Sequence, residues 1–516
     1  MGHETELKFI GPDDALARLR RSPNLRRWAR QRRPKTHALN AIYFDTDDFA
    51  LRNAGFALRV RSEGGGFVQT VKSANGPDVA TRTELKVAVA ELAPNVEAIE
   101  DKAVRRAIQK ATRKKDLKPV FAVEMHRSSV VLTPKRGTEI EAAFDTGTIK
   151  SLGGRTAASA PIAEFELELL KGNPLDLIAC ARELTSGHSL VLSLQSKSAR
   201  GYALADDTID SPAGAGRVIL PRGATADDAF GQILSHCLRH LLDNWAAVTQ
   251  ARDPEGIHQM RVAMRRLRSA LALFGGSFRH ALRDLEEEVR WLAGVLGEAR
   301  DLDVFQEDVF RPAAEAHGED GPLVELATVV RTRRRIAWHN VLEALEAERF
   351  RKLALDIVGV TFSRPWLDHS IGGEAAVRPA MDFAHERLAH CYGRAMKLAR
   401  RISELDAEER HELRIRLKRF RYAVDFFASL YPKRAVKKYL KRLSALQDVL
   451  GAMNDAAVAR ALVREILVEH GEGAGAASIG YAGGIIAGWH LGHARERAKQ
   501  LNRSWKRFAK LRPVWE

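Results

Sequence analysis

With 516 residues, the chain is long enough for two to four domains that each bury their own core. Hydrophobic residues make up 45% and charged residues 29%, which is typical of a globular protein and excludes a largely disordered one. The formal net charge of +16 predicts a polyanionic partner, which could be nucleic acid, an acidic membrane surface or polyphosphate.

The cysteines and the apolar segments predict a cellular location. Cys180, Cys237 and Cys391 lie far apart and form no CxxC pair, so we expect free thiols in a reducing, cytoplasmic setting. The charged N-terminal segment lacks the apolar run of a signal peptide. Ile479–His490 is Gly-rich and too short to span a membrane. We therefore expect a cytoplasmic protein without a membrane span.

The first 205 residues alternate with a period of two, which predicts β-strands. Short helical stretches near 101–111 and 174–185 interrupt them. Many antiparallel strands in one domain predict a closed or nearly closed β-barrel. The predicted strands are Glu4–Phe9, Phe56–Ser62, Gly66–Ser73, Thr83–Val89, Val120–Leu132, Glu139–Asp145 and Ile162–Leu170.

Residues 206–222 contain Pro, Gly and Asp without a clear period and are interpreted as a linker. Beyond them the pattern is helical and contains an internal repeat. His258–Phe274 aligns without a gap with His411–Phe427, and Leu296–Val304 aligns with Leu450–Val458 one residue out of that register. We expect an α+β multidomain protein, with a β-barrel in 1–205 and an all-α domain in 223–516 made of two repeats, about 223–365 and 378–516.

Charges alternate with apolar residues along several predicted strands. In the first strand, Glu4, Glu6 and Lys8 fall on one face and Leu7 and Phe9 on the other. A solvated charged face would explain any single strand. However, acidic residues gather on the first and last strands while Arg and Lys dominate the middle ones, and a solvated face needs no such segregation. Turned inward, these charges would need ion pairs, metal or ligand to offset the cost of burial.

The charged strands resemble a known family. ETELK at Glu4–Lys8 resembles the ExExK signature of the CYTH, or triphosphate tunnel metalloenzyme, superfamily. Further motifs follow in the family's order over about residues 1–205: LRVR at 58–61, TVK at 70–72, TRTELK at 81–86, Arg127, FDTG at 144–147, EFELEL at 164–169 and SKSARGY at 196–202. ExExK alone is a weak signal, whereas the ordered set is specific.

The resemblance implies a barrel tunnel in which carboxylates hold Mg²⁺ or Mn²⁺ and cations bind phosphate oxygens. It implies metal ligands at Glu4, Glu6, Glu166 and Glu168, supported by Asp145. It implies triphosphate binding by Arg59, Arg61, Lys72, Arg82, Arg127 and Lys197, with Glu84 as a supporting carboxylate. Lys8, Glu166 and Glu168 are the expected catalytic residues, and which glutamate takes a proton stays open.

Each helical repeat carries a basic stripe. The stripes are His258, Arg261, Arg265 and Arg268, and His411, Arg414, Lys418 and Arg421, at the same offsets. At about 100° per residue each stripe falls on one face, opposite an apolar face. A solvated basic face is the alternative, but no acidic residue relieves the repulsion along either stripe. Each stripe is about 15 Å long, which favours an extended polyanion.

The duplicated pattern resembles the CHAD domain, the conserved-histidine α-helical domain, over about residues 222–516. HQMRVAMRRLR, LGEARDLDV, HELRIRLKRFRY and LQDVLGAMND carry the resemblance. It implies two pseudo-symmetric helical bundles that bind inorganic polyphosphate. The second repeat departs from the first, with Asn454 in place of Arg300 and Ala457 in place of Asp303. Asp301 and Asp455 are expected to pair with the basic helices.

Together the two halves predict a metal-dependent inorganic triphosphatase, with longer polyphosphate as an open extension, tethered to polyphosphate by the helical domain. A non-catalytic polyphosphate-binding or granule-associated protein is the first alternative. A nucleoside or thiamine triphosphatase and an adenylate cyclase are the others. Nucleic acid is a poor fit because the basic helices lack interleaved aromatic residues for base stacking, apart from Phe420 and Tyr422, and Phe420 lies on the apolar face. The oligomeric state stays open.

Overall fold

The computed structural model describes residues 2–31, 33–63, 65–73, 81–113, 115–153, 158–318, 320–368, 373–471 and 473–516. The chain forms two compact units. The first unit contains residues 1–213, 241–251 and 346–363, and the second contains 214–240, 252–345 and 364–516. Segments from the helical half of the sequence therefore belong to the first unit. Among the described residues, no helix is long and apolar enough to cross a membrane.

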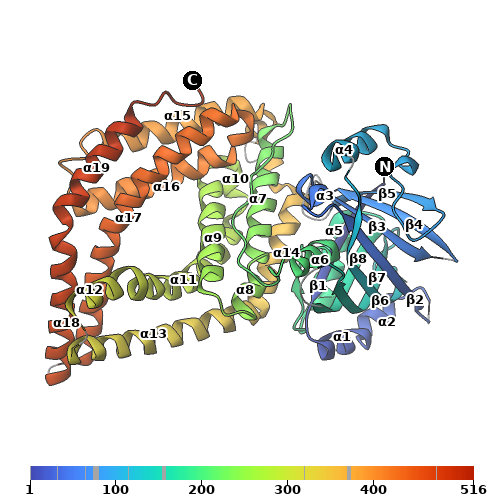
Figure 1. Ribbon diagram of the computed structural model, residues 1–516, viewed down its shortest axis with the longest axis horizontal. Coiled ribbons are helices and arrows are strands. Elements are labelled where there is room, and N and C mark those ends of the chain that lie inside the picture. Colours follow the sequence, from blue (N-terminus) through green and yellow to red (C-terminus); the bar gives the residue numbers. More distant parts are fainter. Residues whose placement is uncertain are drawn as a thin grey trace. The chain divides into compact units, whose positions relative to one another are not determined.

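The first unit is built on an antiparallel sheet (Figure 1). Its strand order is β5-β4-β3-β2-β6-β7-β8-β1-β9. Neighbouring strands are mostly consecutive in the chain, as expected for hairpin connections. The strands are β1 (Gly2–Ile10), β2 (Lys35–Asp45), β3 (Phe56–Glu63), β4 (Gly66–Ser73), β5 (Thr81–Val89), β6 (Lys118–Leu132), β7 (Glu139–Ser151), β8 (Ser159–Lys171) and β9 (Val191–Leu192). The antiparallel sheet predicted from the period-two pattern is confirmed.

The sheet does not close as a regular barrel, and on this point the prediction is corrected. The strand β1 also pairs with β5, but only over Gly2–Thr5, whereas it pairs with β8 over Glu6–Ile10. The two ends of the sheet therefore meet through different halves of one strand. A regular barrel would need β1 to pair with both neighbours along a common length.

The alternation of side chains separates an apolar layer from a charged face. Leu7, Phe9, Phe165 and Leu167 are at most 1% exposed, and the rings of Phe9 and Phe165 lie 6.1 Å apart. Burial of each such side chain contributes about 1.5–3 kcal/mol to stability. The helices α1 (Asp13–Arg20) and α5 (Pro174–Thr185) pack against β8. The intervening charged residues consequently share the other face of the strands.

One short helix brings a cation to the charged face. The helix α6 (Lys197–Ala205) packs against β6 and β7. Its N-cap is Ser196, whose hydroxyl accepts a hydrogen bond from the Ala199 amide at 3.0 Å. This cap starts the helix at Lys197 and holds that residue in its first turn. The remaining helices of the first unit are α2 (Pro23–Trp28), α3 (Ala50–Asn53), α4 (Lys102–Thr112), α8 (Trp245–Thr249), α14 (Glu348–Ser363) and the 3₁₀ turn η1 (Val96–Ala98).

The second unit is helical. Its elements are α7 (Ala226–Leu242, as far as His240), α9 (Pro254–Phe274), α10 (Gly276–His280), α11 (Arg283–Val304), the π-helix η2 (Phe305–Phe310), α12 (Arg311–His317), α13 (Gly321–Glu346), η3 (Pro365–Leu367), η5 (Gly373–Val377), α15 (Ala380–Ala399), α16 (Ala407–Phe426), η6 (Ala428–Leu430), α17 (Lys433–His470), α18 (Ala474–Gly492) and α19 (Ala494–Ala509). The helices α15, α16 and α17 pack side by side (Figure 1).

The corresponding helices of the two repeats are α9 and α16, which pack against each other. Asp253 caps α9 ahead of Pro254, and Asp406 and Glu409 form a capping box on α16. Their predicted apolar faces are buried, since each of these residues is at most 1% exposed: Met260, Met264, Leu267, Leu271, Phe274, Leu413, Leu417, Phe420, Val424 and Phe427. On each of the two helices, the basic stripe therefore lies opposite the buried apolar face.

Candidate functional site

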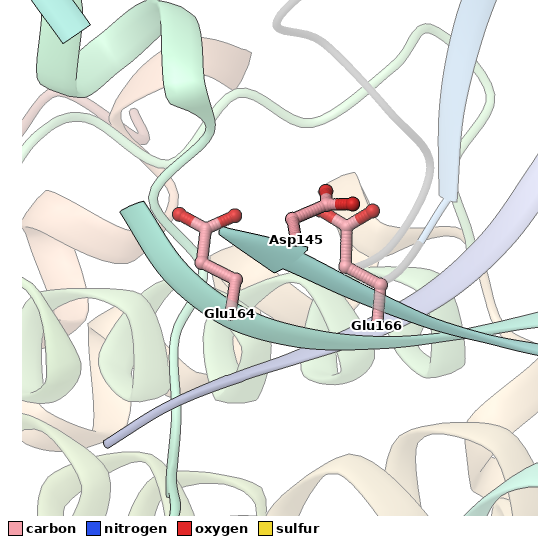
Figure 2. A group of neighbouring side chains, drawn as sticks. All are labelled: Asp145, Glu164 and Glu166. Carbon is pink, nitrogen blue, oxygen red and sulfur yellow. The ribbon is translucent and has the colours of Figure 1, made fainter. Parts of the chain in front are cut away.

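A buried acidic cluster forms on the charged face of the sheet. Asp145 on β7 lies opposite Glu164 on β8, and Glu166 follows two residues later on the same face. One carboxylate oxygen from each residue lies within 4.8 Å of the other two, and all three residues are buried. Figure 2 shows the carboxylates of Asp145 and Glu166 close together, with Glu164 beside them. This group could hold a metal ion.

An internal cation already lies among these carboxylates. The Lys197 ammonium is 2.7 Å from an oxygen of each of Asp145, Glu164 and Glu166. Burial alone would lower the pKa of Lys197, but Glu166, Glu164 and Asp145 raise it well above its usual value. In turn Lys8 and Lys197 outweigh the effect of burial and lower the pKa of Glu164 to about 2. Lys197, Arg127 and Lys8 likewise outweigh burial and hold the pKa of Glu166 well below its usual value, so both glutamates are ionised at neutral pH.

Further cations surround the cluster. Arg127 binds Asp145 with two hydrogen bonds, Nε to Oδ1 at 2.8 Å and Nη2 to Oδ2 at 2.7 Å, and it also binds Glu166. Arg200 donates to Glu164 at 3.0 Å. Lys8 donates to the Gln195 carbonyl at 2.7 Å. Three carboxylates thus face four cations, and this pairing offsets the cost of burying so much charge.

The donor chemistry of the cluster fits a hard divalent cation, because Mg²⁺ and Mn²⁺ prefer carboxylate oxygens. The Lys197 ammonium, however, takes the position shared by the three carboxylates. A metal ion could bind all three only after Lys197 had moved. The carboxylates therefore suit a divalent metal ion chemically, but all three can bind it only when Lys197 has left their shared position.

The predicted metal ligands divide into two groups. Asp145 and Glu166 belong to the buried cluster, whereas Glu6 and Glu168 lie opposite each other on β1 and β8, outside it. The side chain of Glu4 lies outside the described residues. Two carboxylates were missed by the sequence analysis. Glu164 completes the cluster and was visible in the alternation of EFELEL, while Glu141 lies opposite Glu168 and belongs to no motif.

The predicted phosphate ligands also divide. Glu84 pairs with Arg59 and Lys72, each at 3.2 Å, so it serves as a counter-ion to basic residues. Arg59 is close enough to Arg127 for their charges to interact, which joins this basic group to the acidic cluster. Arg61 lies on the same face of β3 as Arg59. The side chain of Arg82 lies outside the described residues.

In the second unit the two basic stripes converge. Burial and the charges of Arg261, Arg414 and Arg421 lower the pKa of Arg265, which places arginines of α9 and α16 in one cationic group. Arg261 also donates to Asp301 at 2.8 Å, the pairing expected for the first repeat. Arg268 is exposed, and Lys418 is half-buried. The side chain of Asp455 lies outside the described residues.

The equivalent histidines of the two repeats have different partners. Burial and the positive charge of Arg300 lower the pKa of His258 to about 4. His411 instead shares a hydrogen bond between its Nδ1 and Asn454 Oδ1, at 2.5 Å. The substitution of Asn454 for Arg300 therefore falls on the residue that faces each histidine. It makes the surroundings of the two histidines electrostatically different.

Two protein-family models match this chain, one in its strand-rich part and one in its helical part. Residues 2–202 match the CYTH domain, and residues 232–464 match the CHAD domain. The chain combines a CYTH domain with a CHAD domain. The CYTH domain carries the acidic cluster, and the CHAD domain carries both basic stripes. The resemblances inferred from the strand and helix motifs are thereby confirmed.

Individual relatives match at moderate identity. An uncharacterized protein of Mycobacterium tuberculosis is 27% identical over 447 residues, 82% of this chain and 81% of that protein. An inorganic triphosphatase of Haemophilus influenzae is 29% identical over 170 residues, 32% of this chain and 46% of that protein. The crystal structure of the CHAD domain from the plant Ricinus communis is 31% identical, with a TM-score of 0.49, and covers 58% of this chain and 97% of that one.

Proposed function

We propose that the CYTH domain hydrolyses inorganic triphosphate with the help of a divalent metal ion. The observation that carries the proposal is the charged face of the sheet, where the Asp145–Glu164–Glu166 cluster lies among Lys8, Arg127 and Lys197. Phosphoryl transfer needs both kinds of group, because the transferred phosphoryl and the leaving group carry negative charge. The similarity to an inorganic triphosphatase over 170 residues supports the same reaction class.

The cations of the charged face would bind the substrate. Arg127 and Lys197 are already desolvated and oriented by the carboxylates that they contact. Phosphate oxygens that reach them would replace some of those carboxylate contacts with charge-assisted hydrogen bonds of similar geometry. Arg59 and Lys72, held by Glu84, would bind the neighbouring phosphate. On substrate binding, these cations thus exchange carboxylate partners for phosphate oxygens. The substrate does not enter a site of unpaired cations.

A bound Mg²⁺ or Mn²⁺ would neutralise phosphate charge and activate water. Glu6 and Glu168, with Glu4, would hold it, and Glu166 and Asp145 would join them when Lys197 turns to the substrate. Lys8 would remain beside Glu164 and Glu166, at 3.8 and 3.9 Å, and would fix their carboxylates. In this arrangement Glu166 and Glu168 are the carboxylates nearest to the chemistry.

The CHAD domain would hold polyphosphate along α9 and α16. The support is the cationic group of Arg261, Arg265, Arg414 and Arg421, extended by His258, Arg268, His411 and Lys418. A polyanion that binds here offsets the mutual repulsion of these arginines. Tethering would raise the local concentration of phosphate chains at the CYTH domain. Such a protein would work in the cytoplasm, where polyphosphate granules form.

A polyphosphate sensor without turnover is the second candidate. It is favoured by one observation, namely that Lys8, Arg127, Lys197 and Arg200 all pair with carboxylates of the acidic cluster. A site of this kind could bind anions by rearranging its ion pairs. The two candidates differ in whether phosphate is released.

The deciding experiment measures phosphate release from tripolyphosphate, ATP and thiamine triphosphate with Mg²⁺ or Mn²⁺. We expect the wild type to hydrolyse tripolyphosphate best and the Glu6→Ala variant to lose at least about 100-fold in kcat. Glu124→Ala is the matched control, because Glu124 lies on the same sheet, is exposed and pairs with Lys150. Release from none of the substrates would favour the sensor, and preference for ATP would favour a nucleotide enzyme or, with cyclic product, a cyclase.

A further inference from the structure

The CHAD domain contains a second basic site, away from the stripes on α9 and α16. A pocket of about 520 Å³ is lined by Arg331, Arg334, Arg335 and Trp338 of α13 together with Arg252 and Gln306. On α13, Arg331 and Arg335 are four residues apart, as are Arg334 and Trp338, so the helix presents both pairs on neighbouring rows. None of these residues belongs to the predicted polyphosphate-binding set.

One wall of the pocket is fixed by a buried aspartate. Arg334 Nε donates to Asp303 Oδ1 at 2.6 Å, and Trp338 Nε1 donates to the same oxygen at 3.4 Å. The Arg334 guanidinium also lies over the Trp338 ring, 5.5 Å from its centroid. Asp303 is the residue that Ala457 replaces in the second repeat. The sequence therefore provides this anchor in the first repeat alone.

Three cations of the pocket are available to a ligand. No carboxylate oxygen of the described residues lies within 4.0 Å of Arg252, Arg331 or Arg335. Arg331 donates to the Thr328 hydroxyl, which is neutral, at 3.0 Å. Arg252 and Arg335 are exposed. Unlike Arg334, these guanidinium groups can bind phosphate oxygens without breaking an ion pair.

The remainder of the wall does not suit a bare phosphate chain. Trp338 and Leu342 provide an apolar surface. Gln306 lies in the π-helical turn η2, and its Oε1 is buried without a hydrogen-bond partner among the described residues. The internal phosphates of an ionised chain have neither a ring to cover the apolar surface nor a proton to donate to this oxygen. π-Helical turns occur frequently at functional sites.

We propose that this pocket binds a nucleoside phosphate. Its phosphate would lie between Arg252, Arg331 and Arg335, and its base would pack against Trp338 and Leu342. The Gln306 side chain would turn so that its Oε1 accepts a hydrogen bond from an N–H of the base. The pocket volume of about 520 Å³ falls within the range of small-ligand sites. The site would make the CHAD domain responsive to nucleotide levels, independently of the triphosphatase reaction.

Equilibrium dialysis of the full-length protein against labelled AMP, with EDTA present, tests the proposal. AMP has no phosphoanhydride bond, so binding is separated from hydrolysis and stands or fails whatever the CYTH domain does. We expect saturable binding that weakens at least about tenfold in Arg335→Ala and in Gln306→Leu, since charge-assisted and buried hydrogen bonds are lost. Arg333→Ala is the control, because Arg333 is on the same helix but pairs with Glu465 outside the pocket.

Competition distinguishes a nucleotide from its phosphate group. Ribose 5-phosphate and tripolyphosphate should each displace AMP at least about tenfold less effectively than unlabelled AMP. Equal displacement by either compound would overturn the nucleotide assignment. So would an Arg335→Ala variant that folds normally and binds AMP as tightly as the wild type.

Discussion

Arg127 holds Asp145 through two parallel hydrogen bonds of 2.8 and 2.7 Å, from β6 to the directly opposite position of β7. Asp145 is completely buried and has no access to water that could replace this partner. Burial favours a lower pKa for Arg127, but Asp145 and Glu166 reverse the effect and raise it. The pair therefore links the basic and acidic parts of the charged face and fixes the position of both.

Removal of the Arg127 guanidinium should destabilise the CYTH domain. The Arg127→Ala variant leaves Asp145 and Glu166 buried with fewer counter-ions, and loss of one partner of a buried pair typically costs about 3–5 kcal/mol. We expect the urea midpoint of the CYTH transition to fall, measured by circular dichroism. Arg26→Ala, at an exposed position of α2, should leave it unchanged. An unchanged midpoint for Arg127→Ala would mean that the pair contributes nothing to stability.

Removal of the Lys197 ammonium should create a stronger metal site. Lys197 is 2.7 Å from each of three carboxylates, so Lys197→Met removes the cation that lies among them and leaves their shared position to a metal ion. We expect Mn²⁺ to bind this variant at least about tenfold more tightly than the wild type, while triphosphatase activity is lost. Electron paramagnetic resonance of free Mn²⁺ gives the affinity. Equal affinity in both proteins would show that Lys197 does not compete with metal.

The period-two pattern was sufficient to predict the sheet and its charged face, because alternation decides which residues lie together. It could not predict which carboxylates form the buried acidic cluster. Glu164, Glu166 and Glu168 are equivalent in the alternation of β8, and only the register with β7 and β1 separates the buried pair from Glu168. It also overestimated closure, because the sharing of β1 between β5 and β8 is a long-range pairing with no local signal.

The helical half was more predictable where the packing is local. The apolar faces of α9 and α16 follow from the spacing of their residues alone. By contrast, the pocket beside α13 needs Asp303 on α11 and Arg334 on α13 to meet, and these residues are 31 positions apart. The inclusion of residues 346–363 in the first unit was likewise invisible, because helical periodicity says nothing of the surface that a helix packs against.

The cationic group of the CHAD domain should be needed for polyphosphate binding. Arg265→Glu places a carboxylate among Arg261, Arg414 and Arg421, so it both removes a phosphate ligand and neutralises its neighbours. We expect long-chain polyphosphate affinity to fall more than about tenfold, with a weaker dependence on salt. Arg283→Glu makes the same change in net charge at the start of α11 and should have little effect. Similar losses in both variants would indicate a response to net charge alone.

His258 should titrate far below an ordinary histidine. Its pKa is lowered from 6.5 to about 4, by burial and by Arg300, so His258 is neutral in the folded protein at pH 7. In the unfolded chain His258 takes up a proton at a higher pH than in the folded protein. The stability of the folded protein should therefore decrease as the pH falls from about 6.5 to about 4. Two-dimensional NMR of the imidazole signals measures the midpoint. Polyphosphate should raise it by adding negative charge, and a midpoint near 6.5 without ligand would contradict the structure.

One substitution can give His411 a positively charged neighbour like that of His258. Asn454 accepts or shares a hydrogen bond with His411, in the place where Arg300 repels His258. The Asn454→Arg variant should therefore remove this hydrogen bond and place a positive charge beside His411, as Arg300 does beside His258. The added cation lies beside His411 of the basic stripe on α16, so polyphosphate affinity should rise about threefold or more. Asn454→Gln keeps the amide and serves as the control, with polyphosphate affinity measured for both variants. Equal polyphosphate affinity in the two variants would show that the charge of the residue facing the histidine does not affect binding.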